Sequence, residues 1–137
     1  LINLNDVAVA LPFTACHEAA HQAGYAREEE ANYIAWLACL SGGESMQYAG
    51  YLNILKYSMD LLRTADESLW SACASEMDAG VRADFSALGG FAAARSTRVR
   101  ALQNGAAEAF LRANGQVGGL TQYTAVVPLV YALWQTK

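Results

Sequence analysis

The chain has few charged residues, and its charge narrows the range of partners that it could bind. Charged residues make up 16% of its 137 residues, and the net charge is −4 with a pI near 5.0. An acidic chain has no electrostatic reason to attract a nucleic-acid backbone, so we expect no nucleic-acid partner. Repeats, low-complexity tracts and linkers are also absent. A single domain over residues 1–137 is therefore expected.

Cysteine is also scarce, with Cys16, Cys39 and Cys73 leaving at least one thiol unpaired. Their spacing matches neither a zinc finger nor a redox motif. We expect all three to be small buried apolar residues.

One long stretch, residues 113–136, has no charged side chain, but three glycines and Pro128 interrupt it. These interruptions favour a buried core helix, from Thr121 to about Gln135, over a membrane-spanning one.

Both histidines of the chain fall in one motif, His17-Glu18-Ala19-Ala20-His21. Residues four apart lie on one face of a helix, so the two imidazoles could bind one metal ion. Glu18 is about 100° further round the helix, where its carboxylate could take a proton from a zinc-bound water. The alternative is that His17 and His21 are ordinary helix residues satisfied by local hydrogen bonds.

Acidic residues follow shortly after this motif, beyond Gly24, which we expect to end the first helix. A second helix is expected to begin near Arg27 or Glu28, because acidic side chains suit a helix N-terminus. Counting from Glu28 in helical steps gives a row of small inward residues: Ala31, Asn32, Ala35, Ala38 and Cys39. Glu28 is therefore our choice for the third metal ligand, with Glu30 as second choice.

The rest of the pattern is helical, which predicts a mainly α, compact domain. A helix from Glu44 to about Arg63 is apolar on much of its circumference and is expected to be central. Asp66 is expected to cap a short helix. Further helices are expected over Val81–Leu88 and Phe91–Ala113, and a flexible loop over residues 114–119.

The chain could also begin with a strand, because residues 6–11 alternate loosely between polar and apolar. A short N-terminal edge strand could pair with an extended peptide substrate. A plain apolar lead-in to the first helix is equally compatible with the pattern.

The run from Leu11 to Asn32 resembles a bacterial HExxH family catalogued only as a domain of unknown function. The resemblance continues through residues 48–51 and, near the C-terminus, through residues 111–115 and 122–123. Glu28-x-x-Ala31-Asn32 is similar to the second motif of gluzincin peptidases and to a helix of the IrrE-like zinc peptidases. The interval between His21 and Glu28 is much shorter than in most gluzincins.

This resemblance implies a minimal gluzincin, a zincin-like helical fold. His17, His21 and Glu28 would bind Zn²⁺, Glu18 would be the general base, and Asn32 would orient a ligating histidine. It also implies a parent protein in which the domain follows transmembrane helices, so that a soluble domain acts at a bacterial membrane through a segment outside this sequence.

The expected function is that of a zinc metalloprotease that hydrolyses peptide bonds in a peptide or protein substrate. The tetrahedral oxyanion would need a further donor, and the resemblance offers Tyr51, Tyr123 and Tyr48. Each of these tyrosines is also a reasonable core aromatic residue. The alternative function is that of a zinc-binding interaction or sensor domain without proteolytic activity.

Overall fold

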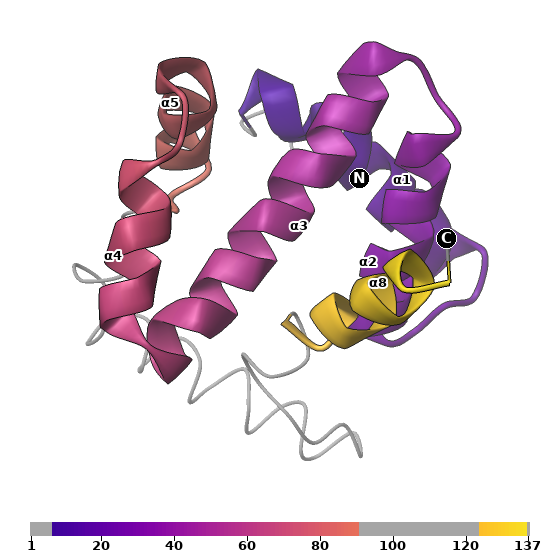
Figure 1. The fold of residues 1–137 in the computed structure, drawn as a ribbon. Helices are drawn as coiled ribbons and strands as arrows, with labels where there is room; N and C mark the ends of the chain where they lie inside the picture. Colours follow the sequence, from indigo (N-terminus) through magenta and orange to yellow (C-terminus); the bar gives the residue numbers. More distant parts are fainter. Residues whose placement is uncertain (1–6, 91–123, 137) are drawn as a thin grey trace, which may run out of the picture.

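A long helix, α3 (Glu44–Ala65), runs through the middle of the molecule, and the other elements pack around it (Figure 1). The computed structural model describes residues 7–90 and 124–136. On one side of α3 lie α1 (Leu11–Gln22), α2 (Glu28–Leu40) and α8 (Val126–Trp134). On the other side lie α4 (Glu67–Ser75) and α5 (Ala79–Ala87). The prediction of a mainly α domain is confirmed.

Two apolar clusters hold these elements together, one on each side of α3. The first joins α1, α2, α3 and α8 around buried side chains: Phe13, Ala35, Trp36, Cys39 and Ala49. The second joins α3 to α4 and α5 through Leu52, Met59, Ala74 and Phe85. A helix that buries two faces must be apolar around much of its circumference, as the sequence of α3 is.

The predicted N-terminal strand is wrong for residues 7–11; residues 1–6 lie outside the described ranges. Ala8–Ala10 form a 3-10 helix that leads directly into α1. The alternation covers too few residues to define a strand, and Pro12 in the first turn of α1 favours a helix there. No strand occurs anywhere in the described part of the chain.

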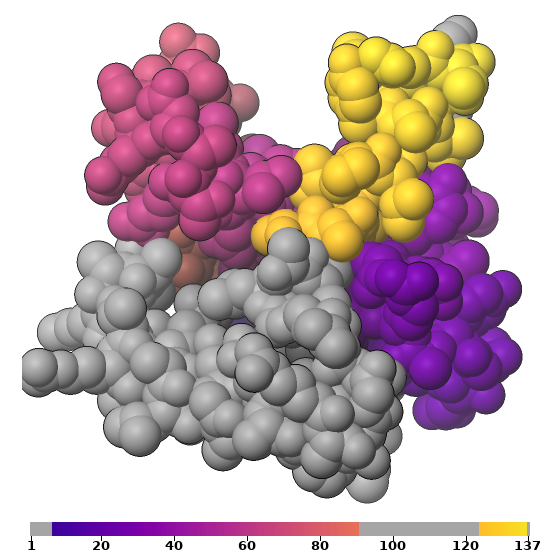
Figure 2. All heavy atoms as spheres, turned by 90° about the horizontal axis from the view of Figure 1, so that it is seen from below, coloured from indigo at the N-terminus to yellow at the C-terminus, as the bar shows by residue number. Residues whose placement is uncertain are grey.

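The last helix is not buried as predicted. Val126 alone is fully buried in α8, whereas the large apolar residues Leu129, Tyr131 and Trp134 are 40%, 56% and 70% exposed. Val126, Val130 and Leu133 recur at helical spacing and form the inward face. In Figure 2, α8 (yellow) and the α3–α4 region form two projections with a hollow between them.

Among the cysteines, only Cys39 is buried as predicted; Cys16 is half-buried and Cys73 is exposed on α4. Burial raises the pKa of the Cys39 thiol to about 12, so it stays protonated and packs as an apolar group. Cys73 shows that a short surface helix can expose a small apolar residue.

The other predicted boundaries lie close to the observed ones. The Asp66 carboxylate accepts a hydrogen bond from the Leu69 amide at 2.9 Å and caps α4 as expected. The helix α5 begins two residues earlier than Val81. The helix predicted over Phe91–Ala113 and the loop after it lie outside the described residues. None of the helices in the described ranges is long and apolar enough to cross a membrane.

Close packing of α3 against α2 should make Gly50→Ala destabilising. A Cβ at Gly50 would lie 2.9 Å from the Cβ of Cys39, so the helices must separate at a cost of about 1–3 kcal/mol. Urea unfolding followed by circular dichroism measures this change. The matched control is Gly80→Ala on α5, where nothing lies within 4 Å of the new Cβ; it should leave stability unchanged or slightly raised. Equal effects at the two glycines would contradict the packing argument.

Candidate metal centre

Two histidines stand one helical turn apart at the end of α1. Phe13 and Ala20 are buried on the inner side of this helix, which turns His17 and His21 towards the start of α2. The His17 and His21 Nε2 atoms are 3.0 Å apart, and the two rings meet edge to face. The side chains are only 16% and 28% exposed, so both nitrogens are largely shielded yet open to a small ion.

A tight turn after α1 brings the next helix back beside these rings. Gly24 has φ +102°, a conformation that favours glycine. The Tyr25 amide donates to the Ala20 carbonyl at 3.1 Å and the Gly24 amide to the His21 carbonyl at 3.0 Å. This pair of bonds is a Schellman motif, which ends α1 as the glycine predicted.

Glu28, the first residue of α2, completes the cluster. Its Oε2 lies 3.4 Å from His17 Nε2 and its Oε1 lies 3.6 Å from His21 Nε2. Among the described residues, His17, His21 and Glu28 are the group of potential ligands close enough to hold one metal ion. The acidic side chain at the helix N-terminus also suits the dipole of α2.

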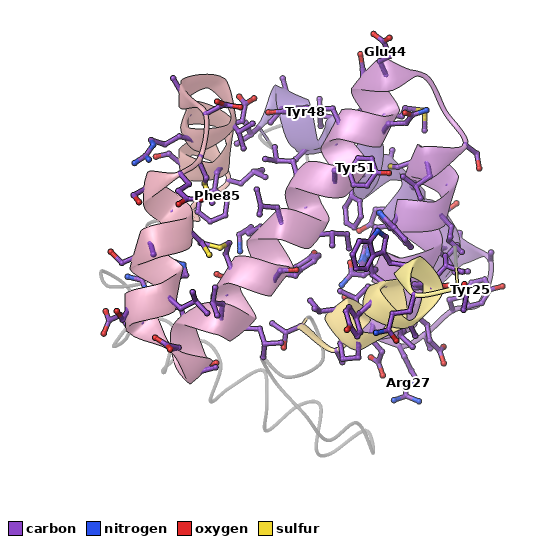
Figure 3. The ribbon with its side chains drawn as sticks, in the orientation of Figure 1. Tyr25, Arg27, Glu44, Tyr48, Tyr51 and Phe85 are labelled. Atoms are coloured by element: carbon purple, nitrogen blue, oxygen red, sulfur yellow. The ribbon has the colours of Figure 1, made fainter. Side chains whose placement is uncertain are left out.

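The neighbouring glutamates of α2 point elsewhere. Glu30, the second choice for the third ligand, is exposed, and Glu29 is buried in an ion pair with Arg27. Figure 3 marks Tyr25 and Arg27 at the turn between α1 and α2. The turn at Gly24 thus lets Glu28 reach both histidines despite the short interval in sequence.

A backbone carbonyl fixes the protonation of His21. Its Nδ1 lies 2.7 Å from the Tyr25 carbonyl oxygen, which can only accept, so Nδ1 must carry the proton. The lone pair of a neutral His21 is then on Nε2, the atom that faces His17 and Glu28. Such a hydrogen bond behind a metal-binding imidazole is the usual arrangement in metal sites.

Asn32 lies one turn after Glu28 on the inner side of α2 and is 1% exposed. The predicted inward row of small residues is confirmed for Ala31, Ala35 and Cys39, which are fully buried. It is wrong for Ala38, which is exposed. The Asn32 amide helps to raise the pKa of His17. The role that the resemblance gives Asn32, orienting His17, stays a prediction, because His17 Nδ1 has no hydrogen-bond partner within the described part of the chain.

The Glu28 carboxylate and the His17 imidazole stabilise each other's charged forms. The bond to the Glu28 carboxylate raises the pKa of His17 above its ordinary value, against the opposing effect of burial. The same contact with His17 lowers the pKa of Glu28. A proton on His17 Nε2 thus lies between the carboxylate and the lone pair of His21, in the position that a cation could take.

The donor set fits zinc. Tetrahedral Zn²⁺ with bonds near 2.1 Å keeps its ligand atoms about 3.4 Å apart. The two Nε2 atoms are 3.0 Å apart, and the two oxygens of the Glu28 carboxylate lie 3.4 Å from His17 and 3.6 Å from His21. Two imidazoles and one carboxylate leave a coordination position open, which is typical of catalytic rather than structural zinc sites.

Glu18, the candidate base, is half-buried beside this cluster on α1. The candidate oxyanion donors are placed less favourably. Tyr48 donates its hydroxyl to the Asp84 carboxylate at 2.7 Å, which raises the pKa of Tyr48 to about 12. Tyr51 is 57% exposed, and within the described ranges no hydrogen bond joins it to the site (Figure 3). Tyr123 lies outside the described residues.

Two features of the site escaped sequence reasoning. The Tyr25 carbonyl is a backbone group, which no side-chain pattern can indicate. The second is Tyr57 of α3, whose hydroxyl lies 3.4 Å from Asn32 Oδ1. The sequence offered no signal that linked it to α2.

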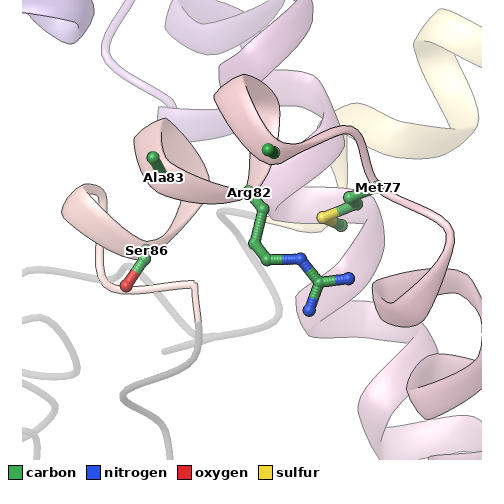
Figure 4. Close-up of a pocket in the computed structure, with 5 residues that line it drawn as sticks. Met77, Arg82, Ala83 and Ser86 are labelled. Carbon is green, nitrogen blue, oxygen red and sulfur yellow. The ribbon is translucent and has the colours of Figure 1, made fainter.

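A hollow along α5 and the loop before it has a different character from the cluster on α1 and α2. It measures about 550 Å³ and is lined by small or apolar residues around Arg82 (Figure 4). The Arg82 guanidinium donates to the carbonyls of Ala74 and Ser75 at 2.7 and 2.9 Å. Arg82 therefore caps the end of α4, and this hollow lacks the convergent polar groups of the cluster on α1 and α2.

Comparison with known proteins gives one match. A family model, DUF3810, described as a protein of unknown function, matches residues 2–131. No curated protein and no solved structure matches the chain. The matched region contains both helices of the candidate metal centre, and its description assigns them no activity.

The geometry predicts different outcomes for two glutamates in the first turn of α2. Glu28→Ala should weaken zinc binding by more than about 100-fold, because even the partners behind metal ligands contribute 10–100-fold. It should also lower the pKa of His17 in the metal-free protein, because the carboxylate that raises it is gone. Chelator competition and NMR titration measure the two effects. Glu30→Ala should change neither, and zinc binding lost through Glu30 alone would refute the assignment.

The turn at Gly24 should matter to both stability and metal affinity. Gly24→Ala places a side chain at φ +102°, which should cost about 1–2 kcal/mol of unfolding free energy. A shift of the Tyr25 carbonyl should also reduce zinc affinity by roughly tenfold. Isothermal titration and urea unfolding measure the two quantities. Gly43→Ala, at φ −71° with open space around it, should bind zinc like the wild type; an equal loss there would point to a general effect.

Proposed function

The chain belongs to the DUF3810 family, and from its metal centre we propose that it is a zinc-dependent metallopeptidase of the gluzincin type. The observation that carries the proposal is the convergence of His17, His21 and Glu28, with Glu18 next to His17 on the same helix. A site that only stores metal has no need for the additional carboxylate. By the resemblance to membrane-tethered HExxH proteins, we extend the proposal to a domain that works at a membrane.

Zinc is the metal we propose for this site. Two histidines and one carboxylate also suit Fe(II). The pair of histidines at i and i+4 on one helix, with a glutamate between them, favours zinc because this spacing is typical of zinc peptidases. Metal analysis of the purified protein distinguishes the two ions.

The roles of the individual residues follow from their positions. Bound zinc would act as a Lewis acid that polarises a peptide carbonyl and lowers the pKa of water towards about 7. The Glu18 carboxylate would accept a proton from the attacking water and donate it to the leaving amine. The Tyr25 carbonyl and the Asn32 amide would hold the rings of His21 and His17 in the orientations that present Nε2.

A zinc-binding interaction domain without proteolytic activity is the second candidate. Two observations favour it: Leu129, Tyr131 and Trp134 of α8 are exposed, and neither Tyr48 nor Tyr51 is bonded to the site within the described ranges. Glu18 favours the peptidase, since an interaction domain gains nothing from a base.

Glu18→Gln separates these functions. The variant should bind zinc as tightly as the wild type, because Glu18 is not a ligand, and should cleave casein or a peptide library at least about 100-fold more slowly. Glu30→Gln makes the same change at an exposed position and should retain full activity. Unchanged cleavage in Glu18→Gln would exclude the mechanism. A wild-type protein that binds zinc stoichiometrically and cleaves nothing would favour the interaction domain.

A further inference from the structure

A buried carboxylate follows directly after Glu28 in the sequence. It belongs to Glu29, the second residue of α2, which is only 8% exposed. One oxygen of this carboxylate pairs with the Arg27 guanidinium, and the other, Oε2, has no hydrogen-bond partner within the described part of the chain. Removing a carboxylate from water is costly unless the charge is paired. The ion pair with Arg27 is therefore what makes the burial of Glu29 tolerable.

Within the described residues, the N-terminus of α2 has no side-chain cap. Arg27 occupies the N-cap position, with φ −86° and ψ 135°. Arginine has no acceptor atom in its side chain, so it cannot bind the free amides of the first turn as Ser, Thr, Asp or Asn would. The first hydrogen bond of the helix runs from the Ala31 amide to the Arg27 carbonyl at 2.9 Å. Other contacts must therefore hold the first turn of α2 in place.

The ion pair between Arg27 and Glu29 is such a contact. The two residues flank Glu28, so their side chains close a ring that contains the backbone of residue 28. This ring restricts the backbone of Glu28, whose carboxylate oxygens lie 3.4 Å from His17 Nε2 and 3.6 Å from His21 Nε2. The Arg27 side chain is 68% exposed and that of Glu29 is 11% exposed. The pair thus joins the solvent-facing turn to the buried side of α2.

Loss of this pair should act first on Glu28. Without Arg27, the Glu29 carboxylate would be a buried charge with no partner, and the first turn of α2 would have to open to bring it to water. Helix ends open more readily than helix centres, and Glu28, as the first residue of α2, moves with that turn. The histidines would keep their places, because Phe13 and Ala20 anchor the inner side of α1.

We propose that Glu29 is a positioning residue of the candidate metal centre: its ion pair with Arg27 keeps the first turn of α2 closed, so that the Glu28 carboxylate stays against both histidines. The consequence for metal binding rests on the function proposed above. The consequence for the first turn of α2 does not, because the ion pair joins two side chains of the protein itself.

The first experiment measures zinc affinity by chelator competition in a double-mutant cycle. Arg27→Gln should lower zinc affinity about tenfold, the low end of the range for residues that hold metal ligands in place. Glu29→Gln should lower it about threefold, because it breaks the pair without leaving a buried charge unpaired. The variant with both changes should lose no more affinity than Arg27→Gln alone, because the two side chains act as one pair.

The matched control is Glu30→Gln, which removes a carboxylate from the same helical turn at an exposed position. It accounts for the loss of a negative charge near the N-terminus of α2, and it should bind zinc like the wild type. Arg27→Lys can still pair with Glu29 and should recover most of the affinity lost in Arg27→Gln. Wild-type affinity in Arg27→Gln would overturn the proposal. A double variant whose loss equals the product of the two single losses would also overturn it.

A second measurement, hydrogen exchange of the metal-free protein, does not depend on zinc. The Ala31 amide, which is bonded to the Arg27 carbonyl, reports opening of the first turn of α2. Its exchange should be at least about tenfold faster in Arg27→Gln, whereas the Ala35 amide, one turn further, should exchange as in the wild type. Unchanged exchange at Ala31, or an equal rise at both amides, would refute the positioning role. If Ala31 behaves as expected but the wild type binds no zinc, the proposed function fails and the role of the ion pair in α2 stands.

Discussion

The candidate metal centre depends on a carboxylate that a turn of the backbone holds against two imidazoles. Glu28 lies seven positions after His21 in the sequence, and a helix continuing from α1 would carry it away from both rings. The turn at Gly24 reverses the chain, so the N-terminus of α2 meets the C-terminal part of α1. The raised pKa of His17 and the lowered pKa of Glu28 are the electrostatic result of that closeness.

The packing around α3 supports this arrangement from behind. Small residues on the inner side of α2 allow it to lie close to its neighbours; they include Ala31, Ala35 and Cys39. On α3, the missing side chain of Gly50 leaves room for Cys39. The apolar cluster that includes Phe13 and Trp36 therefore fixes the distance between the helices that carry the histidines and the glutamate. The second cluster, with Phe85, stabilises the other side of α3 and does not touch the centre.

The sequence predicted what local periodicity determines. The helical class, the common face of His17 and His21, the end of α1 at Gly24 and the capping role of Asp66 all follow from spacing or from one residue's conformational preference. The choice of Glu28 rested on the row of small residues, and the structure places Glu28 beside both rings. The burial of α8 was mispredicted because an uncharged sequence does not reveal how much of a helix finds a partner. The contact of Tyr57 with Asn32 joins residues far apart in the chain, which no local pattern encodes.

His21 donates its hydrogen bond to the backbone carbonyl of Tyr25, so this contact does not depend on which side chain residue 25 carries. Every amino acid offers the same carbonyl, so the side chain at this position is free to vary without disturbing His21. That side chain is 41% exposed, so a substitution at position 25 would leave the hydrogen bond to His21 intact. The restriction at this turn falls on Gly24 instead, whose φ of +102° favours glycine.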